Sequence, residues 1–245
     1  RQQGLLQNGQ PVPPQIAAEL HSSSLRSAAA TMLLTRQVGE ILQTLNQAGI
    51  PAIVLKGLHL AELVYPELQL RPISDVDLLI QRTQMQAAQQ ALAGLGYQPQ
   101  RHSGAGATAN DHHHLPPLRK DGAHPIELHW TLAPPGGVTA PEPGGVWQRA
   151  VPVRLGEQHA LVLCREDTLL HLAVHFQAHN FRLTLRHLYD FVALLQPGSP
   201  PIDWEAVQTR SREWRAEKSL FLCLHLAHAL LGCPLPPGLL MALQP

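Results

Sequence analysis

The sequence predicts an α+β protein, in which a small mixed β-sheet is flanked by helices and followed by a C-terminal helical bundle. Short β-branched runs alternate with helical stretches in the middle of the chain. A long stretch of helical periodicity precedes them, and only helical patterns follow. The expected parts are N-terminal helices over residues 1–48, a sheet-containing core over 49–164 and a helical domain over 165–245.

The N-terminal helical pattern covers residues 15–47, after a loop over 11–14, and it is closed by Gly49 and Pro51. A serine cluster at 22–24 is a candidate break that would divide it into two helices, because serine side chains compete for backbone hydrogen bonds.

The core pattern alternates strands with helices. Thr83 is a candidate N-cap, and the glycines at 94 and 96 end the helix that it would begin. The expected elements are strand 52–55, helix 58–65, strand 76–80, helix 83–95, a strand from Tyr97, a loop over 100–121, strand 125–130, an irregular segment over 131–145 and a hairpin of 151–155 with 160–163.

Four helices are expected in the C-terminal part, and Asp203 is a candidate N-cap for the third. The prolines from Pro234 to Pro237 end the last long helix. Asp190 follows Arg186 at helical i+4 spacing, which predicts an ion pair within one helix. The expected helices cover 166–179, 183–195, 204–215 and 216–231, with a short helical turn near the end.

Two carboxylates, Asp75 and Asp77, lie in an otherwise apolar stretch whose alternation has the period of a β-strand. The two side chains should therefore share one face. Two carboxylates side by side on one face of a strand repel each other, which favours protonation of one of them unless a divalent cation neutralises their charge. Oxygen ligands suit Mg²⁺ or Mn²⁺, so the pattern indicates a metal site. A strand with one solvated face is the alternative.

Lys56 and Gly57 end a short β-branched run and precede a helical stretch. A helix N-terminus after a glycine turn binds phosphate through backbone N–H groups, and the lysine would add positive charge. A surface lysine beside a turn glycine would look the same. Further on, Glu127 and His129 should share one face of a strand, where Glu127 would complete a carboxylate trio. The alternative is an edge strand with a polar face and a core histidine.

These motifs, in this order, resemble the uncharacterised bacterial nucleotidyltransferases of the polymerase-beta-like superfamily. The resemblance covers residues 37–196. Its core is S-D-V-D-L-L at 74–79, and the other matching segments are L-K-G at 55–57, Y-P at 65–66, Arg71, G-Y at 96–97, I-E-L-H-W at 126–130, E-D-T-L-L-H-L at 166–172 with His175, and L-Y-D-F at 188–191.

The resemblance implies transfer of a nucleoside monophosphate from a nucleoside triphosphate (NTP) to an unidentified acceptor, in biosynthesis of natural products or polysaccharides. It implies that Asp75, Asp77 and Glu127 are catalytic and bind Mg²⁺ or Mn²⁺. Gly57 would bind phosphate. Members of the wider superfamily usually place serine or glycine after this glycine, whereas this chain has Leu58, a departure that fits the uncharacterised subgroup it resembles. Lys56, Arg71 and Ser74 would then compensate in nucleotide binding, and His129 and His175 would contact substrate.

Three alternatives to that function stay open. The first is a catalytically inactive nucleotide-binding or regulatory module with the same fold, which the missing hydroxyl after Gly57 favours. The second is a toxin-like nucleotidyltransferase acting on tRNA or protein. The third is a zinc hydrolase, because His171, His175 and His179 recur at every fourth residue of one helix. A polar helix face explains the same spacing. A solvated loop is expected to carry the histidines at 112–114, and a role in gripping substrate is the alternative, because this loop leads to Glu127.

The composition argues against other classes of protein. The chain has 245 residues with 18 basic and 18 acidic side chains, and no half is strongly basic, so nucleic acid is not an expected partner. No apolar run approaches the roughly 20 residues that cross a membrane, and no secretory leader is visible. Cys164, Cys223 and Cys233 have no metal-ligand spacing and are expected to be buried thiols of a cytoplasmic protein.

Overall fold

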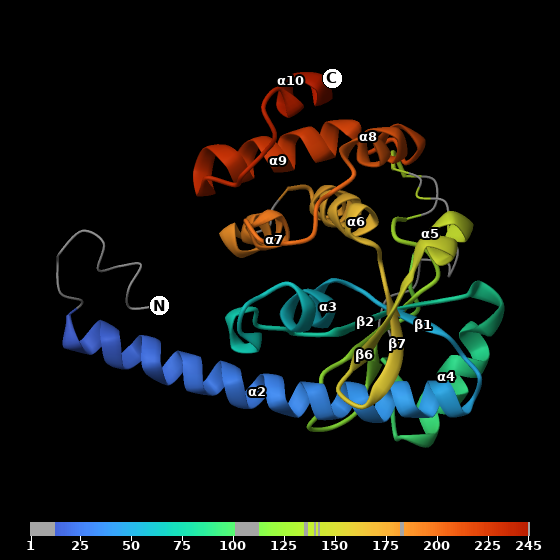
Figure 1. Cartoon of the computed structure of the whole chain (residues 1–245). Helices are drawn as coiled ribbons and strands as arrows, with labels where there is room; N and C mark the ends of the chain where they lie inside the picture. The colour runs from blue at the N-terminus through green and yellow to red at the C-terminus, as the bar shows by residue number, and fades with distance from the viewer. Residues whose placement is uncertain are drawn as a thin grey trace.

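The computed structural model describes residues 13–100, 113–134, 137–139, 141, 143–181 and 184–244. Figure 1 shows a layered molecule, in which the long helix α2 lies beneath the sheet and the helices from α6 onward lie above it. This arrangement confirms the predicted α+β class, with a mixed sheet between helices and a helical C-terminal part. Most of the predicted loop over 100–121 lies outside the described residues.

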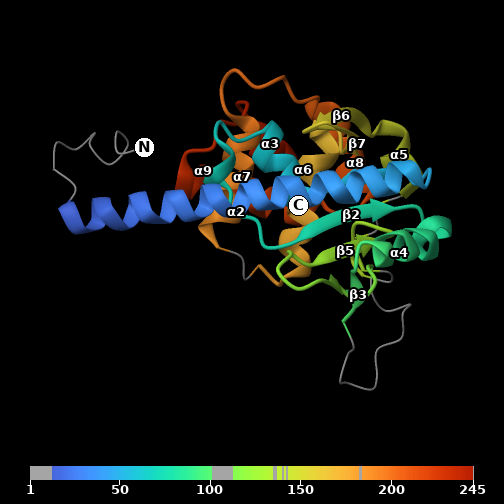
Figure 2. The ribbon, with the colours of Figure 1, turned by 90° about the horizontal axis from the view of Figure 1, so that it is seen from below.

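One continuous helix, α2 (Pro14–Gln47), forms the N-terminal layer. The predicted break at the serines is wrong: the helix runs through them, and Arg26 donates a hydrogen bond to the Ser22 hydroxyl at 2.7 Å. These serines are exposed, so water and neighbouring side chains satisfy them without disturbing the helix. Only the second half of α2 is buried, where it crosses the sheet near β7 and α4 (Figure 2).

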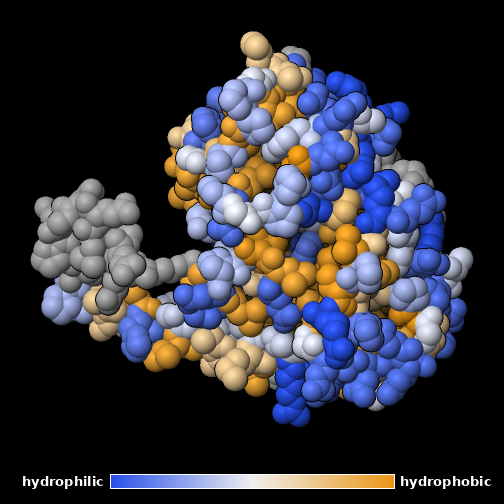
Figure 3. Space-filling model, viewed as in Figure 1, coloured by the Kyte–Doolittle hydropathy of each residue, from blue (hydrophilic) through white to orange (hydrophobic). Residues whose placement is uncertain are grey.

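The first half of α2 extends beyond the body of the molecule. Hydrophobic side chains are exposed among polar ones in this region (Figure 3). The exposed large hydrophobic residues of the helix are Ile16, Leu20, Leu25, Met32 and Leu33.

Among the described residues, seven strands form one mixed sheet in the order β3-β4-β5-β2-β1-β7-β6. The central strands β1 and β2 are antiparallel, whereas β2 pairs with β5 and β1 pairs with β7 in parallel. The predicted hairpin is confirmed as β6 and β7. The bounds are β1 Ala52–Val54, β2 Val76–Ile80, β3 Gln98–Pro99, β4 Leu118–Arg119, β5 Ile126–His129, β6 Val151–Leu155 and β7 Gln158–Val162.

Both faces of the central strands are buried, because side chains alternate between two hydrophobic clusters. On β2, Leu78 and Ile80 pack in the cluster that contains α2 and α4, whereas Leu79 packs in the cluster that contains the C-terminal helices. Asp77 lies two residues before Leu79, so it faces the C-terminal helices. The same alternation places Glu127 and His129 on that face of β5.

Three helices connect the strands of the core: α3 (Lys56–Leu63), α4 (Met85–Gly94) and α5 (Pro143–Arg149). Two local predictions are wrong. A 3₁₀ turn, Arg82–Gln84, precedes α4, so Gln84 rather than Thr83 is its N-cap, without a side-chain hydrogen bond. The short strand β4 also lies within the predicted loop, where it pairs with β5.

The C-terminal part consists of α6 (Arg165–Ala178), α7 (Leu185–Leu195), α8 (Trp204–Glu213), α9 (Glu217–Leu231) and α10 (Leu239–Leu243). The predicted N-cap Asp203 is confirmed, since its Oδ1 accepts a hydrogen bond from the Ala206 backbone at 3.0 Å. Residue 183, at the predicted start of α7, lies outside the described residues.

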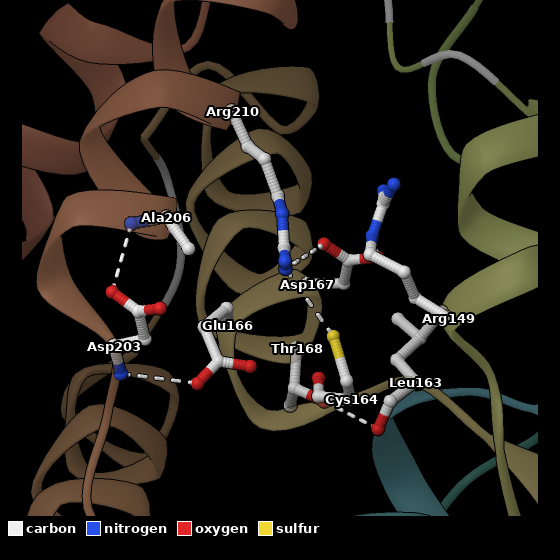
Figure 4. A network of polar contacts seen from close by, with 9 residues as sticks. All are labelled: Arg149, Leu163, Cys164, Glu166, Asp167, Thr168, Asp203, Ala206 and Arg210. Carbon is white, nitrogen blue, oxygen red and sulfur yellow. Dashed lines mark hydrogen bonds and ion pairs between the residues drawn. The ribbon is translucent and has the colours of Figure 1, made fainter.

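A charged network joins α5, α6 and α8 (Figure 4). Asp167 is fully buried, and its two oxygens accept hydrogen bonds from Arg149 at 2.9 Å and from Arg210 at 3.0 Å. Arg210 also lies 3.4 Å from the Cys164 sulfur. Cys164 is only partly buried, which corrects the prediction that all three thiols are buried; the other two are. This network fixes α6 where it faces the sheet.

A second buried network joins the core to α7. Asp190 does not pair with Arg186, so the predicted intrahelical ion pair is wrong. Its carboxylate accepts two hydrogen bonds from Arg71, both at 3.0 Å, and one from the Tyr65 hydroxyl at 2.7 Å. Asp190 points inward on α7, whereas Arg186 is exposed and donates to the Pro72 carbonyl at 3.3 Å. Burial and Asp190 raise the pKa of Tyr65 well above its usual range.

Buried His59 on α3 gives a testable pH dependence. Burial, with a smaller contribution from Arg165, lowers its pKa from 6.5 to about 4. The unfolded chain therefore binds this proton as the pH falls below 6.5, while the folded chain does not until about pH 4. Stability from neutral His59 is present above pH 6.5 and is lost as the pH falls through this window. We expect His59→Leu to reduce that loss by on the order of 3 kcal/mol.

Urea unfolding at pH 7.5 and pH 4.5 measures this difference for the parent and the variant. Exposed His159 supplies the control, because His159→Gln should leave the pH dependence as it is in the parent. Equal loss of stability in the parent and in His59→Leu would contradict the assignment.

Among the described residues, no helix combines the length and the apolar character that a membrane span requires.

Candidate active site

The parallel pairing of β2 with β5 brings Asp77 directly opposite Glu127. The two residues are far apart in the chain, but their backbones are neighbours in the sheet and their side chains share the face toward α6. Asp77 is buried and Glu127 is partly exposed, with a quarter of its side-chain surface accessible. The sequence predicted this approach of a carboxylate from one strand to a carboxylate from another.

His129 lies between these two carboxylates. Its Nε2 is 3.0 Å from Asp77 Oδ1 and 3.5 Å from Glu127 Oε2. The ring is buried. Of the two alternatives for His129, a residue that borders the site or a histidine of the core, the hydrogen bond to Asp77 agrees with the first. These three residues form a group whose ligand atoms all lie within 4.8 Å of one another, so they have the spacing to hold one metal ion.

Lys56 completes the polar contacts of Asp77. Its ammonium lies 3.0 Å from Asp77 Oδ2, so the two carboxylate oxygens of Asp77 contact two different nitrogen groups. Lys56 is the first residue of α3 and has a positive φ of 25°, which is strained for a residue with a side chain. The sequence identified Lys56 as a candidate phosphate ligand but gave no signal that it pairs with Asp77.

The electrostatics of the group are strongly perturbed. Burial by itself would raise the pKa of Asp77, but the Lys56 charge and the His129 hydrogen bond outweigh burial and hold that pKa far below its usual range. The hydrogen bond from His129 lowers the pKa of Glu127. Burial opposes the charge on His129, yet hydrogen bonds to Asp77 and Glu127 leave its pKa raised. Carboxylates that stay ionised while buried can neutralise a cation.

Asp75 lies just before β2 begins, at the edge of the group. Its pKa is raised by burial and by the charges of Asp77 and, to a smaller degree, Glu127, with Lys56 opposing. Asp75 does not belong to the group of ligand atoms within 4.8 Å of one another among the described residues. The structure therefore places it near the charged cluster but outside its closest part.

The other predicted nucleotide ligands surround the start of α3. A Cβ on Gly57 would lie 3.0 Å from the Ile73 side chain and 3.6 Å from Arg71 Nη1, so a larger residue would have to displace Ile73 by a few tenths of an ångström. Arg71 is buried, with Nε and Nη2 engaged by Asp190. Ser74 is exposed and precedes Asp75, to which it donates a side-chain hydrogen bond.

Helix α6 supplies histidines that face the group. His171 is buried, and neither of its ring nitrogens has a hydrogen-bond partner among the residues that the structure describes. Burial and then the Lys56 charge lower its pKa well below the usual value, and Lys56 has the same effect on His175 after burial. His175 also lies near His179, with ring centroids 4.5 Å apart. Among the described residues, these three histidines form no group with metal-ligand spacing.

Two histidines of the predicted solvated loop lie at the site instead. The rings of His113 and His114 each have their centroid 5.2 Å from that of His129, and residues 114 and 129 form an isolated β-bridge. Burial and then His129 lower the pKa of His113 to about 3. The sequence analysis favoured a solvated loop for both residues and left a role in gripping substrate open, because the loop leads to Glu127. The third histidine of that run, at 112, lies outside the described residues.

The sequence matches the family model described as uncharacterised nucleotidyltransferase over residues 3–232. The chain belongs to that family. No curated protein matches it at a significant level.

Two solved structures of an antibiotic-resistance factor resemble this fold. One is the solution structure of the antibiotic-resistance factor ANT(2'')-Ia, with 11% identity and a TM-score of 0.50, covering 81% of this chain and 100% of that one. Another is the crystal structure of ANT(2'')-Ia in complex with adenylyl-2''-tobramycin, with 10% identity and a TM-score of 0.51, covering 75% of this chain and 98% of that one. The predicted fold and family are confirmed.

Proposed function

We propose that this nucleotidyltransferase moves a nucleoside monophosphate from an NTP to a hydroxyl or similar group of a small acceptor molecule, in a divalent-metal-dependent reaction. The observation that carries the proposal is the placement of Asp77 opposite Glu127 on paired strands, on the face toward α6. Family membership supports the class of reaction.

Asp77 and Glu127, with Asp75 beside them, are the proposed ligands of Mg²⁺ or Mn²⁺. The residues present fit such ions, because Asp77 is ionised although buried and its oxygens lie close to those of Glu127. When bound, two such ions would neutralise the triphosphate and acidify the acceptor hydroxyl.

The start of α3 is the proposed phosphate-binding element. Lys56 is positioned to move from Asp77 to a phosphate, since both are anionic partners for its flexible side chain. Gly57 has no side chain, so a phosphate can approach the backbone at the start of α3, where a Cβ would be crowded by Ile73. Arg71 and Ser74 are proposed to assist in nucleotide binding, Arg71 while held by Asp190. His129 and His175 are proposed to border the substrates.

A small acceptor is proposed from the structural relatives. One solved structure contains ANT(2'')-Ia with adenylyl-2''-tobramycin, in which a nucleotide is joined to a small molecule. The acceptor of this chain would belong to natural-product metabolism in a bacterial cytoplasm. The chain has no net charge with which to attract tRNA, which makes the toxin-like activity the weaker variant.

A catalytically inactive nucleotide-binding module is the second candidate. Two points favour it: Leu58 is buried and has no hydroxyl to offer a phosphate, and Lys56 already neutralises Asp77.

Incubation of the purified chain with each α-labelled NTP, Mg²⁺ or Mn²⁺ and a panel of hydroxylated small molecules tests the proposal. We expect pyrophosphate release that depends on both metal and acceptor, with label transferred to the acceptor. Metal-dependent NTP binding without pyrophosphate release, across the panel, would favour the inactive module.

A further inference from the structure

The proposed metal site contains an imidazole nitrogen, that of His129, in addition to the carboxylates of Asp77 and Glu127. His129 Nε2 is 3.0 Å from Asp77 Oδ1 and 3.5 Å from Glu127 Oε2, and all three ligand atoms lie within 4.8 Å of one another. His129 is on the same strand as Glu127, two residues further on, so the strand period fixes both side chains on one face. The sheet itself therefore presents two oxygens and one nitrogen at one point.

The separations match the ligand shell of a small dication. Metal–ligand bonds of about 2.0–2.1 Å place neighbouring ligands about 2.9 Å apart at a right angle and about 3.4 Å apart at a tetrahedral angle. The two observed separations from His129 Nε2 lie close to these values. An ion that binds His129 together with either carboxylate would therefore meet ordinary ligand separations, and the ligand atoms of the two carboxylates lie within 4.8 Å of each other. Lys56 contacts the other oxygen of Asp77, Oδ2, and leaves Oδ1 directed at this point.

A second observation comes from the opposite wall. His171 of α6 is 3% exposed, and both of its buried ring nitrogens lack a hydrogen-bond partner within the described part of the chain. Lys56, His129 and Asp77 are the first three groups whose charges act on this ring, and β2 carries Asp77 on the face that packs against α6. A buried polar group without a hydrogen bond costs free energy, and a hydrated cation in the cluster would supply partners for the ring.

We propose that Asp77, Glu127 and His129 together bind one first-row transition-metal dication in preference to Mg²⁺. Mg²⁺ prefers an all-oxygen shell, whereas Mn²⁺, Fe²⁺ and Zn²⁺ accept an imidazole nitrogen beside carboxylates. The inference rests on the proposed function for the carboxylate site, and it assigns His129 as a metal ligand rather than a substrate contact.

Electron paramagnetic resonance with Mn²⁺ as the probe tests this on the full chain without nucleotide. We expect one tightly bound Mn²⁺ per chain, and electron spin-echo modulation from one coordinated ¹⁴N. Protein labelled with ¹⁵N-histidine should show the ¹⁵N pattern instead, which identifies the nitrogen as histidine without any substitution. An excess of about tenfold Mg²⁺ should leave most of the Mn²⁺ bound.

His129→Gln then assigns the residue, because it should lose the nitrogen modulation. His113→Asn is the matched control: its ring centroid is 5.2 Å from that of His129, and its loss should leave the modulation intact. Bound Mn²⁺ without nitrogen modulation in the parent, displacement by equimolar Mg²⁺, or no bound Mn²⁺ would each overturn the inference. Pyrophosphate release by the same preparation reports separately on the proposed function, which survives if release persists without nitrogen coordination.

Discussion

Asp77→Asn is expected to reduce pyrophosphate release by a factor of on the order of 10³. The substitution keeps the size of the side chain but removes its negative charge. That charge neutralises Lys56, 3.0 Å from Asp77 Oδ2, and strengthens the hydrogen bond from His129, 3.0 Å from Asp77 Oδ1. An amide is a much weaker ligand for a divalent ion, so the proposed metal and phosphate contacts would be lost together. Initial rates at saturating NTP and metal measure the effect.

The control for Asp77→Asn is Asp121→Asn, which alters an exposed aspartate of the same core and should keep the parental rate. Thermal unfolding of both variants separates a catalytic loss from a folding defect. A folded Asp77→Asn variant with parental turnover would remove the proposed mechanism, because no other residue occupies the position opposite Glu127.

Asp190→Asn is expected to destabilise the protein by about 3–5 kcal/mol, because it leaves a buried guanidinium without its counter-charge. The side chains of Arg71 and Asp190 are 7% and 1% exposed, so water cannot replace the lost partner. The Tyr65 hydroxyl would also lose its carboxylate acceptor. Urea unfolding followed by circular dichroism gives the change in the free energy of unfolding.

Arg186→Gln is the matched control for Asp190→Asn, because Arg186 lies on the same helix four residues earlier but is exposed. It should change the free energy of unfolding by less than about 0.5 kcal/mol. Combining Asp190→Leu with Arg71→Met removes both charges and should recover much of the stability lost in Asp190→Asn. Equal, small effects for Asp190→Asn and Arg186→Gln would show that the buried pair contributes little.

Local periodicity was enough to predict the central elements of the sheet. The alternation around Asp77 gave β2 with its observed bounds, and that around Glu127 gave the strand that carries it. These patterns are informative because successive side chains of a strand point to opposite faces of the sheet, and each face is buried in a separate hydrophobic cluster. The hairpin of β6 and β7 was predictable for the same reason, with Gly156 at a positive φ of 58° in its turn.

Contacts between distant segments were not predictable from the sequence. Asp190 has an arginine at i−4, yet its partner is Arg71, 119 residues away, because its helix face points into the core. His129 fitted two descriptions equally well until the pairing of β5 was known. The ion pair of Lys56 was not predictable either, because its partner Asp77 lies on another element of the core.

The parallel pairing of β2 with β5 has a consequence for folding kinetics. His129 and Asp77 are 52 residues apart along the chain, so bringing them together closes a long loop whose entropy is lost before the contacts form. Such non-local pairing slows folding relative to local hairpins or helices. The protein should therefore bind metal only after β2 and β5 have paired. The time course of metal binding during refolding would then report how fast this pairing forms.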